Sequence, residues 1–171
     1  MSDFNDPRKQ FSRLLEKATR ILAMRDHSET ELRRKLALSL MRAEQTDRQD
    51  EQASDIQQEQ LNKVIQWCQE HGWQDDARFT ERFIASRARK GFGPQRIRME
   101  LAQRGVEKSV AEEGLAASEV NWLDQTYHAA TKKFGEPLPT DWQSQAKVQR
   151  FLIGKGFISE DIREIFRNFA D

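Results

Sequence analysis

Residues 76–105 read DARFTERFIASRARKGFGPQRIRMELAQRG, and this stretch decides the fold. Apolar residues recur at helical spacing on both sides of a short turn, Gly91-Phe92-Gly93-Pro94. Glycine ends helices by adopting a positive φ, and proline suits the first position of the next helix. The stretch therefore predicts two helices joined by a tight turn. It carries eight basic and three acidic side chains, a net charge of +5.

Weaker copies of this pattern lie on both sides of the stretch. Each copy has a helix with an apolar residue four positions before a leucine: Leu32 and Leu36, Ile97 and Leu101, Val148 and Leu152. In the second and third copies that helix ends in basic-Gly-apolar: Arg104-Gly105-Val106 and Lys155-Gly156-Phe157. Internal repeats of this kind predict a solenoid-like row of units, each burying one face on its neighbours.

We therefore predict an all-α fold, an elongated array of three tandem three-helix repeats over residues 1–72, 73–118 and 119–171. Strands are not expected, because alternating β-branched runs are absent and helix-forming residues dominate. A charged fraction of 33 % and a mean hydropathy of −0.86 suit thin helical units better than a thick globule.

Local signals place the helices of the first repeat. Asp6-Pro7 predicts a capped helix start, and Ser28 with Glu31 forms a capping box at the next helix. Residues 43–56, AEQTDRQDEQASDI, contain almost no apolar side chains. We interpret them as an acidic loop or a frayed helix end.

The charge is balanced overall but unevenly distributed. With 28 basic and 28 acidic side chains, the formal net charge is zero, which argues against a protein that coats nucleic acid by charge alone. Residues 8–42 nevertheless carry a net +6 and residues 44–59 a net −5. This alternation favours a directed basic surface.

The cysteine content and the apolar segments of the sequence indicate where in the cell the protein is found. One cysteine, Cys68, excludes an internal disulfide, and its apolar neighbours predict a buried, inert thiol. The N-terminus has no apolar signal segment, and no stretch approaches the roughly 20 apolar residues of a membrane span. We expect a cytoplasmic protein that is not attached to a membrane.

The helix after Asp76 separates an arginine face from an apolar face. At 100° per residue Arg78, Arg82 and Arg89 cluster, and they form either a contact face or an ordinary solvated face. Phe79 and Phe83 lie on the apolar face, and Arg87 falls inside that face, between Phe83 and Ile84. There we expect it to snorkel or to pair with a carboxylate of a neighbouring helix.

The turn that follows adds further charge to the same region. Lys90, Arg96 and Arg98 flank it, while Gly91, Gly93 and Pro94 are expected to have structural roles. Phe92, between two glycines, is either a core residue or an exposed contact residue.

Catalysis finds little support in the sequence. His27, His71 and His128 are isolated, without the spacing of metal ligands. Gly91-Phe92-Gly93 lacks the strand–helix context of a phosphate loop. We predict that the protein is not an enzyme and that it holds no metal ion or cofactor. The residues alone point to a helical repeat protein whose partner is nucleic acid or an acidic protein surface.

The central stretch resembles the signature of the RecX family, bacterial regulators of the RecA recombinase. The resemblance rests on these residues: Asp76, Arg78-Phe79, Phe83-Ile84, Arg87, Lys90-Gly91, Gly93-Pro94, Arg96-Ile97, Glu100-Leu101 and Gly105. Residues 25–28 and 31–36 look like the first repeat of the family, and residues 148–169 look like its last. The resemblance covers about residues 14–171, and the acidic segment 43–56 departs from it.

This resemblance implies a curved array that lies in the groove of the RecA–single-stranded DNA filament. It implies inhibition of strand exchange, ATP hydrolysis and coprotease activity by a monomer that performs no chemistry, with weak direct DNA binding in addition. The candidate contacts to RecA or DNA are Arg33, Arg34, Lys35, Arg78, Arg82, Arg89, Lys90, Arg96, Arg98, Lys147, Arg150 and Lys155. The alternatives are a general nucleic-acid-binding module and a protein-binding adaptor, neither with a RecA role.

Overall fold

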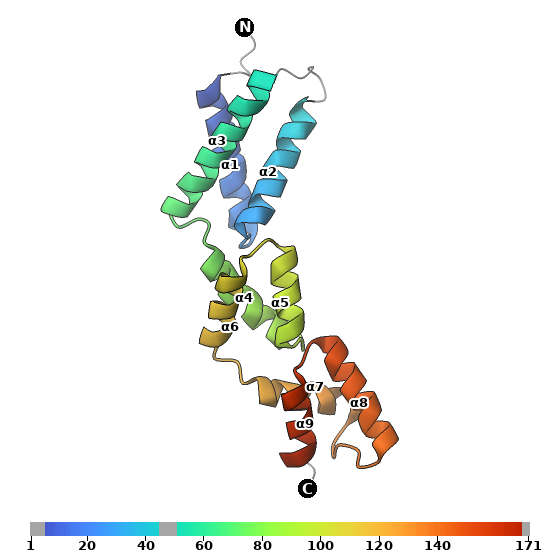
Figure 1. Cartoon of the computed structure of the whole chain (residues 1–171). Coiled ribbons are helices and arrows are strands. Elements are labelled where there is room, and N and C mark those ends of the chain that lie inside the picture. The colour runs from blue at the N-terminus through green and yellow to red at the C-terminus, as the bar shows by residue number, and fades with distance from the viewer. Residues whose placement is uncertain (1–5, 45–50, 169–171) are drawn as a thin grey trace. The chain divides into compact units, whose positions relative to one another are not determined.

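A computed structural model describes residues 6–44 and 51–168, and over these ranges helices are joined by turns and short irregular segments (Figure 1). Nine helices and no strands occur in the described residues, so the all-α prediction is confirmed. In order they are α1 (Pro7–Met24), α2 (Glu29–Glu44), α3 (Glu51–Glu70), α4 (Asp76–Arg89), α5 (Pro94–Gln103), α6 (Lys108–Ala117), α7 (Trp122–Phe134), α8 (Trp142–Lys155) and α9 (Ser159–Asn168).

The chain forms two compact units. The first comprises the described residues up to Phe79 together with Arg104–Val106, and the second comprises Thr80–Gln103 and the described residues from Glu107 onward. In the first unit α1, α2 and α3 pack on one another (Figure 1). Their shared core consists of Leu14, Ala18, Leu32, Leu36, Leu61, Val64, Ile65 and Cys68.

Two predicted helix starts in the first unit are confirmed. The Asp6 side chain accepts a hydrogen bond from Arg8 N at 3.0 Å, and Pro7 opens α1. At α2 the capping box is reciprocal: Glu31 N donates to Ser28 Oγ at 3.1 Å, and Ser28 N donates to Glu31 Oε1 at 3.2 Å. Both arrangements satisfy backbone donors that a helix start leaves unpaired.

Of the two interpretations of residues 43–56, the loop is wrong for residues 43–44 and 51–56, which belong to helix ends. Helix α2 continues to Glu44 and α3 already begins at Glu51, so residues 43–44 and 51–56 are helical. Alanine, glutamate and glutamine are good helix formers, and their intrinsic preference favours helix in a segment with few apolar side chains. Residues 45–50 of the predicted loop lie outside the described residues.

The second unit contains two groups of buried side chains. Helices α4, α5 and α6 bury Ile84, Ala88, Ile97, Leu101, Ala111 and Leu115. Helices α7, α8 and α9 enclose a core of Ala130, Leu138, Val148, Leu152, Phe157, Ile162 and Ile165. The middle-helix pairs Ile97/Leu101 and Val148/Leu152 are thus core residues, as are Leu32 and Leu36 in the first unit.

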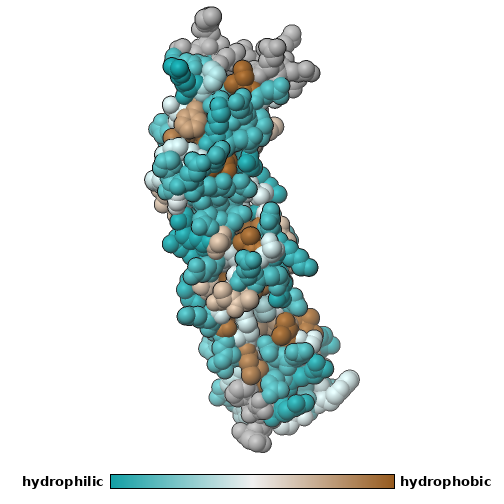
Figure 2. All heavy atoms as spheres, turned by 60° about the vertical axis from the view of Figure 1, so that its left-hand side comes forward, coloured by the Kyte–Doolittle hydropathy of each residue, from teal (hydrophilic) through white to brown (hydrophobic). Residues whose placement is uncertain are grey.

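The surface is predominantly polar. Figure 2 shows a hydrophilic face on which hydrophobic residues form small, separate patches. Among the residues whose side chains the structure describes, the most exposed large apolar ones are Met24, Trp142, Met41 and Ile153. Within the described ranges, every helix is too short or too polar to cross a membrane.

Candidate interaction site

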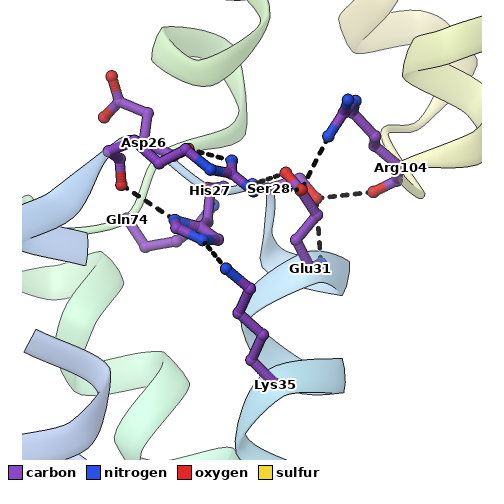
Figure 3. A network of polar contacts seen from close by, with 8 residues as sticks. Asp26, His27, Ser28, Glu31, Lys35, Gln74 and Arg104 are labelled. Atoms are coloured by element: carbon purple, nitrogen blue, oxygen red, sulfur yellow. Dashed lines mark hydrogen bonds and ion pairs between the residues drawn. The ribbon is translucent and has the colours of Figure 1, made fainter. Parts of the chain in front are cut away.

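A polar network in the first unit surrounds the start of α2 (Figure 3). The Glu31 carboxylate lies at its centre and receives Arg25 Nη2 at 3.1 Å and Arg104 Nη1 at 2.9 Å. Ser28 Oγ donates to the Arg104 carbonyl at 2.7 Å. These contacts hold the turn Arg104–Val106 on the corner between α1 and α2. We call this arrangement the first junction.

Glu31 is suited to this central position. Only 12 % of its side chain is exposed. Burial raises the pKa of the carboxyl, but hydrogen bonds from Arg25 and Ser28 and the charge of Arg104 outweigh burial and hold the pKa below its usual value. The carboxylate therefore remains charged at neutral pH and bridges two arginines.

Gly105 lets the turn approach closely. Its φ is +76°, and a Cβ at this position would collide with the Thr30 side chain. A residue with a side chain would meet both a backbone penalty and a steric clash. The glycine of the basic-Gly-apolar motif is thus required by the packing of the first junction.

His27 lies beneath the same corner and is almost fully buried (Figure 3). Its Nδ1 lies 2.9 Å from the Arg25 carbonyl and its Nε2 lies 2.7 Å from Lys35 Nζ. A carbonyl only accepts and an ammonium only donates, so the ring is neutral with its proton on Nδ1. Burial lowers the pKa of His27 and outweighs the carbonyl contact, which raises it.

Several candidate contact residues of the first unit form hydrogen bonds within the unit itself. Arg33 donates to Asn62 Oδ1 at 2.6 Å, and Lys35 meets His27. Arg78 donates to the carbonyls of Gly72 and Trp73 at 2.8 and 3.0 Å. These bonds fasten the α3–α4 connection, which gives Arg78 a structural role that its place on the arginine face did not reveal.

Arg87 in the second unit makes the kind of pair that its apolar setting predicts. Its Nε and Nη2 donate to Glu100 of α5 at 2.7 and 2.6 Å, and 20 % of its side chain is exposed. Arg96 Nε adds a contact to the same carboxylate at 3.3 Å. Burial raises the pKa of Glu100, but the two arginines outweigh it and the pKa lies below its usual value.

Phe92 is surrounded by three cations. The guanidinium carbons of Arg87 and Arg96 lie 4.0 and 4.6 Å from the ring centroid, and Lys155 Nζ lies 4.8 Å from it. Cations at such distances are attracted by the ring quadrupole. The partly buried ring is therefore neither a plain core residue nor a fully exposed one. We call these four side chains the cation cluster.

A second junction holds the cluster together. Gly93 N donates to the Lys155 carbonyl at 2.8 Å, and Gln95 N donates to the Gly156 carbonyl at 2.9 Å. A Cβ at Gly93 would come within 2.5 Å of the Gly156 backbone. The turn before α5 and the turn after α8 thus pack backbone against backbone, which explains the glycine in each.

Aromatic and basic side chains continue from the cluster along α8 and α7. Lys155 Nζ also lies 5.7 Å from the Phe151 ring, and Lys133 Nζ approaches the same ring at 5.7 Å. Phe134 packs edge-on against Phe151 with centroids 5.5 Å apart. It also lines a shallow hollow of about 250 Å³ with Pro137, Pro139, Ser144 and Lys147.

The other candidate contacts differ in their exposure. Arg98 is bound to Glu112 by two hydrogen bonds of 2.6 and 3.2 Å. The remaining candidates of the second unit are exposed: Arg82, Arg89, Lys90, Lys147 and Arg150. Sequence reasoning missed Lys133, Phe134 and Phe151. Their signal was a basic–aromatic run at the end of α7 and an aromatic residue four positions before Lys155.

Reactive groups are not assembled in the described residues. Cys68 is buried, as predicted, and burial raises the pKa of its thiol to about 11. Within residues 6–44 and 51–168, no group of three or more His, Cys, Asp or Glu side chains could hold a metal ion. What the geometry offers is binding chemistry: cations, aromatic rings and paired carboxylates.

Comparison with known proteins identifies close relatives over the whole chain. The chain is 48 % identical to Regulatory protein RecX of Escherichia coli (strain K12) and 47 % identical to that of Escherichia coli O157:H7. In both cases the similarity covers 100 % of each chain. Family models for the second and third three-helix domains of RecX match residues 75–115 and 119–166.

Solved structures share the fold at low sequence identity. The crystal structure of RecX from Lactobacillus salivarius superimposes with a TM-score of 0.74 and 17 % identity, covering 95 % of this chain and 97 % of the other. A second structure, titled regulatory protein RecX, gives a TM-score of 0.69 at 18 % identity and covers 96 % and 73 % of the two chains. Both likenesses support the three-helix-repeat architecture.

Proposed function

This chain belongs to the RecX family of regulatory proteins, and we propose that it binds the RecA–single-stranded DNA filament and inhibits RecA. The observation that carries the proposal is 48 % identity to a curated RecX over the full length of both chains. The proposed inhibition covers recombinase, ATPase and coprotease activities. We also propose that the protein is cytoplasmic and acts as a monomer.

The second unit supplies surface chemistry that suits this role. Arg89, Lys90, Lys147 and Arg150 are exposed, and cations of this kind attract DNA phosphates and acidic protein surfaces. Arg87, Arg96 and Lys155 add partly buried charge around Phe92. Because the whole chain has no net charge, we expect modest affinity for bare DNA and tighter binding where DNA and protein surfaces are presented together.

The proposed regulator acts by binding alone. Its one thiol is buried with a raised pKa, and a thiol in that state is a poor nucleophile. The polar network around Glu31 joins parts of the first unit. Inhibition would then follow from occupying a filament surface that strand exchange requires.

Co-sedimentation with preformed filaments tests the binding step. RecA is assembled on long single-stranded DNA with a non-hydrolysable ATP analogue, and the protein is added at increasing concentration. We expect it to pellet with filaments at concentrations where bare DNA of the same length retains little of it. Equal retention by filaments and by bare DNA would remove the RecA-specific part of the proposal.

A general nucleic-acid-binding module is the second candidate, and the cation cluster is the observation that favours it. Three cations around one ring could bind a phosphate chain without any recombinase. This candidate predicts tight binding to bare DNA with a steep salt dependence, and no gain from RecA. The co-sedimentation comparison at two salt concentrations separates the two.

A further inference from the structure

The two junctions are built to one plan, which allows their residues to be compared position by position. Helix α2 begins at Glu29 and α5 begins at Pro94. Two residues before these starts stand His27 and Phe92, and the third helical residues are Glu31 and Arg96. Each start receives a basic-Gly-apolar turn, led by Arg104 in the first junction and by Lys155 in the second.

The charges at equivalent positions differ. In the first junction the cation of the turn, Arg104, meets the Glu31 carboxylate at 2.9 Å. In the second junction Arg96 takes the place of that carboxylate. Lys155 lies instead over the Phe92 ring, at 4.8 Å, and Arg96 shares the ring at 4.6 Å.

Arg96 and Lys155 carry like charges beside one ring, and like charges repel each other. The ring attracts both cations, and Glu100 pairs with Arg87 and Arg96. Among the described ion pairs none reaches Lys155. The second junction therefore presents positive charge at the surface, whereas in the first junction the cation of the turn is paired. A negatively charged partner would relieve the repulsion.

The positive charge continues as an alternating series. From the cluster the order runs Arg87, Phe92, Lys155, Phe151, Lys133, with each neighbouring cation and ring 4.0 to 5.7 Å apart. Arg96 flanks the series at Phe92, and Phe134 extends it to the hollow beside Lys147. We call these eight side chains the cation–aromatic strip.

We propose that the cation–aromatic strip is the single-stranded nucleic-acid contact of this protein. Its lysines, Lys133, Lys147 and Lys155, meet backbone phosphates. Its rings Phe134 and Phe151 receive bases. Single strands present phosphates and π-faces in alternation, and proteins that bind them without sequence preference combine a basic track with aromatic side chains. An acidic protein surface would need the cations but not the rings. The inference rests on the proposed function, because the strip would supply the DNA contact within the filament.

Fluorescence anisotropy with a labelled oligo(dT) tests the strip on the full chain. Lys155→Gln, Lys133→Gln and Phe151→Leu alter it one side chain at a time, and Lys63→Gln is the control. Lys63 is an exposed lysine of the first unit that is paired with Glu59 at 3.3 Å. Thermal melting of every variant checks that it remains folded.

We expect each lysine variant to weaken oligo(dT) binding roughly three- to ten-fold. The salt slope of binding should flatten by about 0.7 for each phosphate that the variant no longer neutralises. Phe151→Leu should weaken binding with the salt slope unchanged, because it removes stacking and no charge. Lys63→Gln should bind as the unaltered protein does.

The possible outcomes separate this inference from the proposed function. If the protein inhibits RecA but the strip variants keep their oligo(dT) affinity and salt slope, the inference is overturned and the proposed function stands. If RecA is unaffected and the variants lose oligo(dT) binding, the strip is supported and the RecA role fails. Equal competition by poly-glutamate together with an inert Phe151→Leu would assign the strip to an acidic protein and overturn the inference.

Discussion

Arg104 and Glu31, 73 positions apart in the sequence, form an ion pair with 2.9 Å between Nη1 and Oε2. The same carboxylate caps α2 and binds Arg25, so one side chain joins three segments of the first unit. Since only 12 % of Glu31 is exposed, its loss would leave two arginines without their shared partner.

Glu31→Gln should therefore lower the free energy of unfolding by about 1–3 kcal/mol. Chemical denaturation at neutral pH measures this. Glu16→Gln is the matched control, since Glu16 pairs with Arg20 on an exposed surface and should cost less than about 0.5 kcal/mol. A Glu31 variant as stable as the Glu16 variant would show that the network does not hold the first unit together.

Arg87 and Arg89, two positions apart on α4, should respond very differently to truncation. Arg87→Ala removes a two-pronged pair with Glu100 and a contact with Phe92, and should cost about 2–3 kcal/mol of stability. Arg89→Ala should be within about 0.5 kcal/mol of the unaltered protein, because the side chain is exposed. Thermal melts decide, and equal melting points would contradict a structural role for Arg87.

The stability of the protein should fall as the pH is lowered through the titration of His27. Its pKa is lower in the folded protein than the ordinary value of 6.5, chiefly because of burial. The unfolded chain therefore binds the proton more readily, and the loss of stability accumulates as the pH falls from 6.5 through the folded pKa. Above 6.5 this contribution is constant.

Urea unfolding between about pH 5 and pH 7.5 measures this dependence. His27→Gln should flatten the pH profile, because it removes the buried imidazole whose pKa is lowered in the folded protein. An unaltered profile in the His27 variant would assign the acid sensitivity to other groups. Glu31 contributes at lower pH. Because its pKa in the folded protein lies below the ordinary value of 4.5, the stability that its carboxylate adds is lost as the pH falls below 4.5.

Two glycines should respond to alanine with opposite signs. Gly105→Ala forces a side chain into a positive φ and against Thr30, and should cost more than about 1 kcal/mol. Gly154→Ala lies within α8 with open space around its Cβ, and should stabilise the protein by up to about 1 kcal/mol. Melting temperatures that move in the same direction would contradict this packing of the first junction.

Local signals in the sequence were sufficient for the helices and for most of their starts. Asp6-Pro7 and the Ser28–Glu31 box act over a few residues, and the structure contains both. In the acidic segment the few apolar side chains give no periodicity, so the sequence does not decide between a loop and a helix end. The structure extends α2 and α3 into it, as the helix preference of its residues favours.

The candidate site was less accessible to sequence reasoning. A helical projection grouped Arg78 with Arg82 and Arg89, but could not show that Arg78 binds the carbonyls of Gly72 and Trp73. Contacts of Phe92 with Lys155 join positions far apart in the chain, and no periodicity encodes them. The repeated basic-Gly-apolar motif was the available clue, since it marks the turn that each junction uses.

ATP hydrolysis by RecA on single-stranded DNA tests the central claim most directly. The protein is titrated into preformed filaments while ADP release is followed, with Lys63→Gln as the control. We predict progressive loss of ATPase activity at or below a one-to-one ratio with RecA, and the same loss with Lys63→Gln. An unchanged rate at equimolar protein, with the protein folded and the filaments intact, would contradict the account.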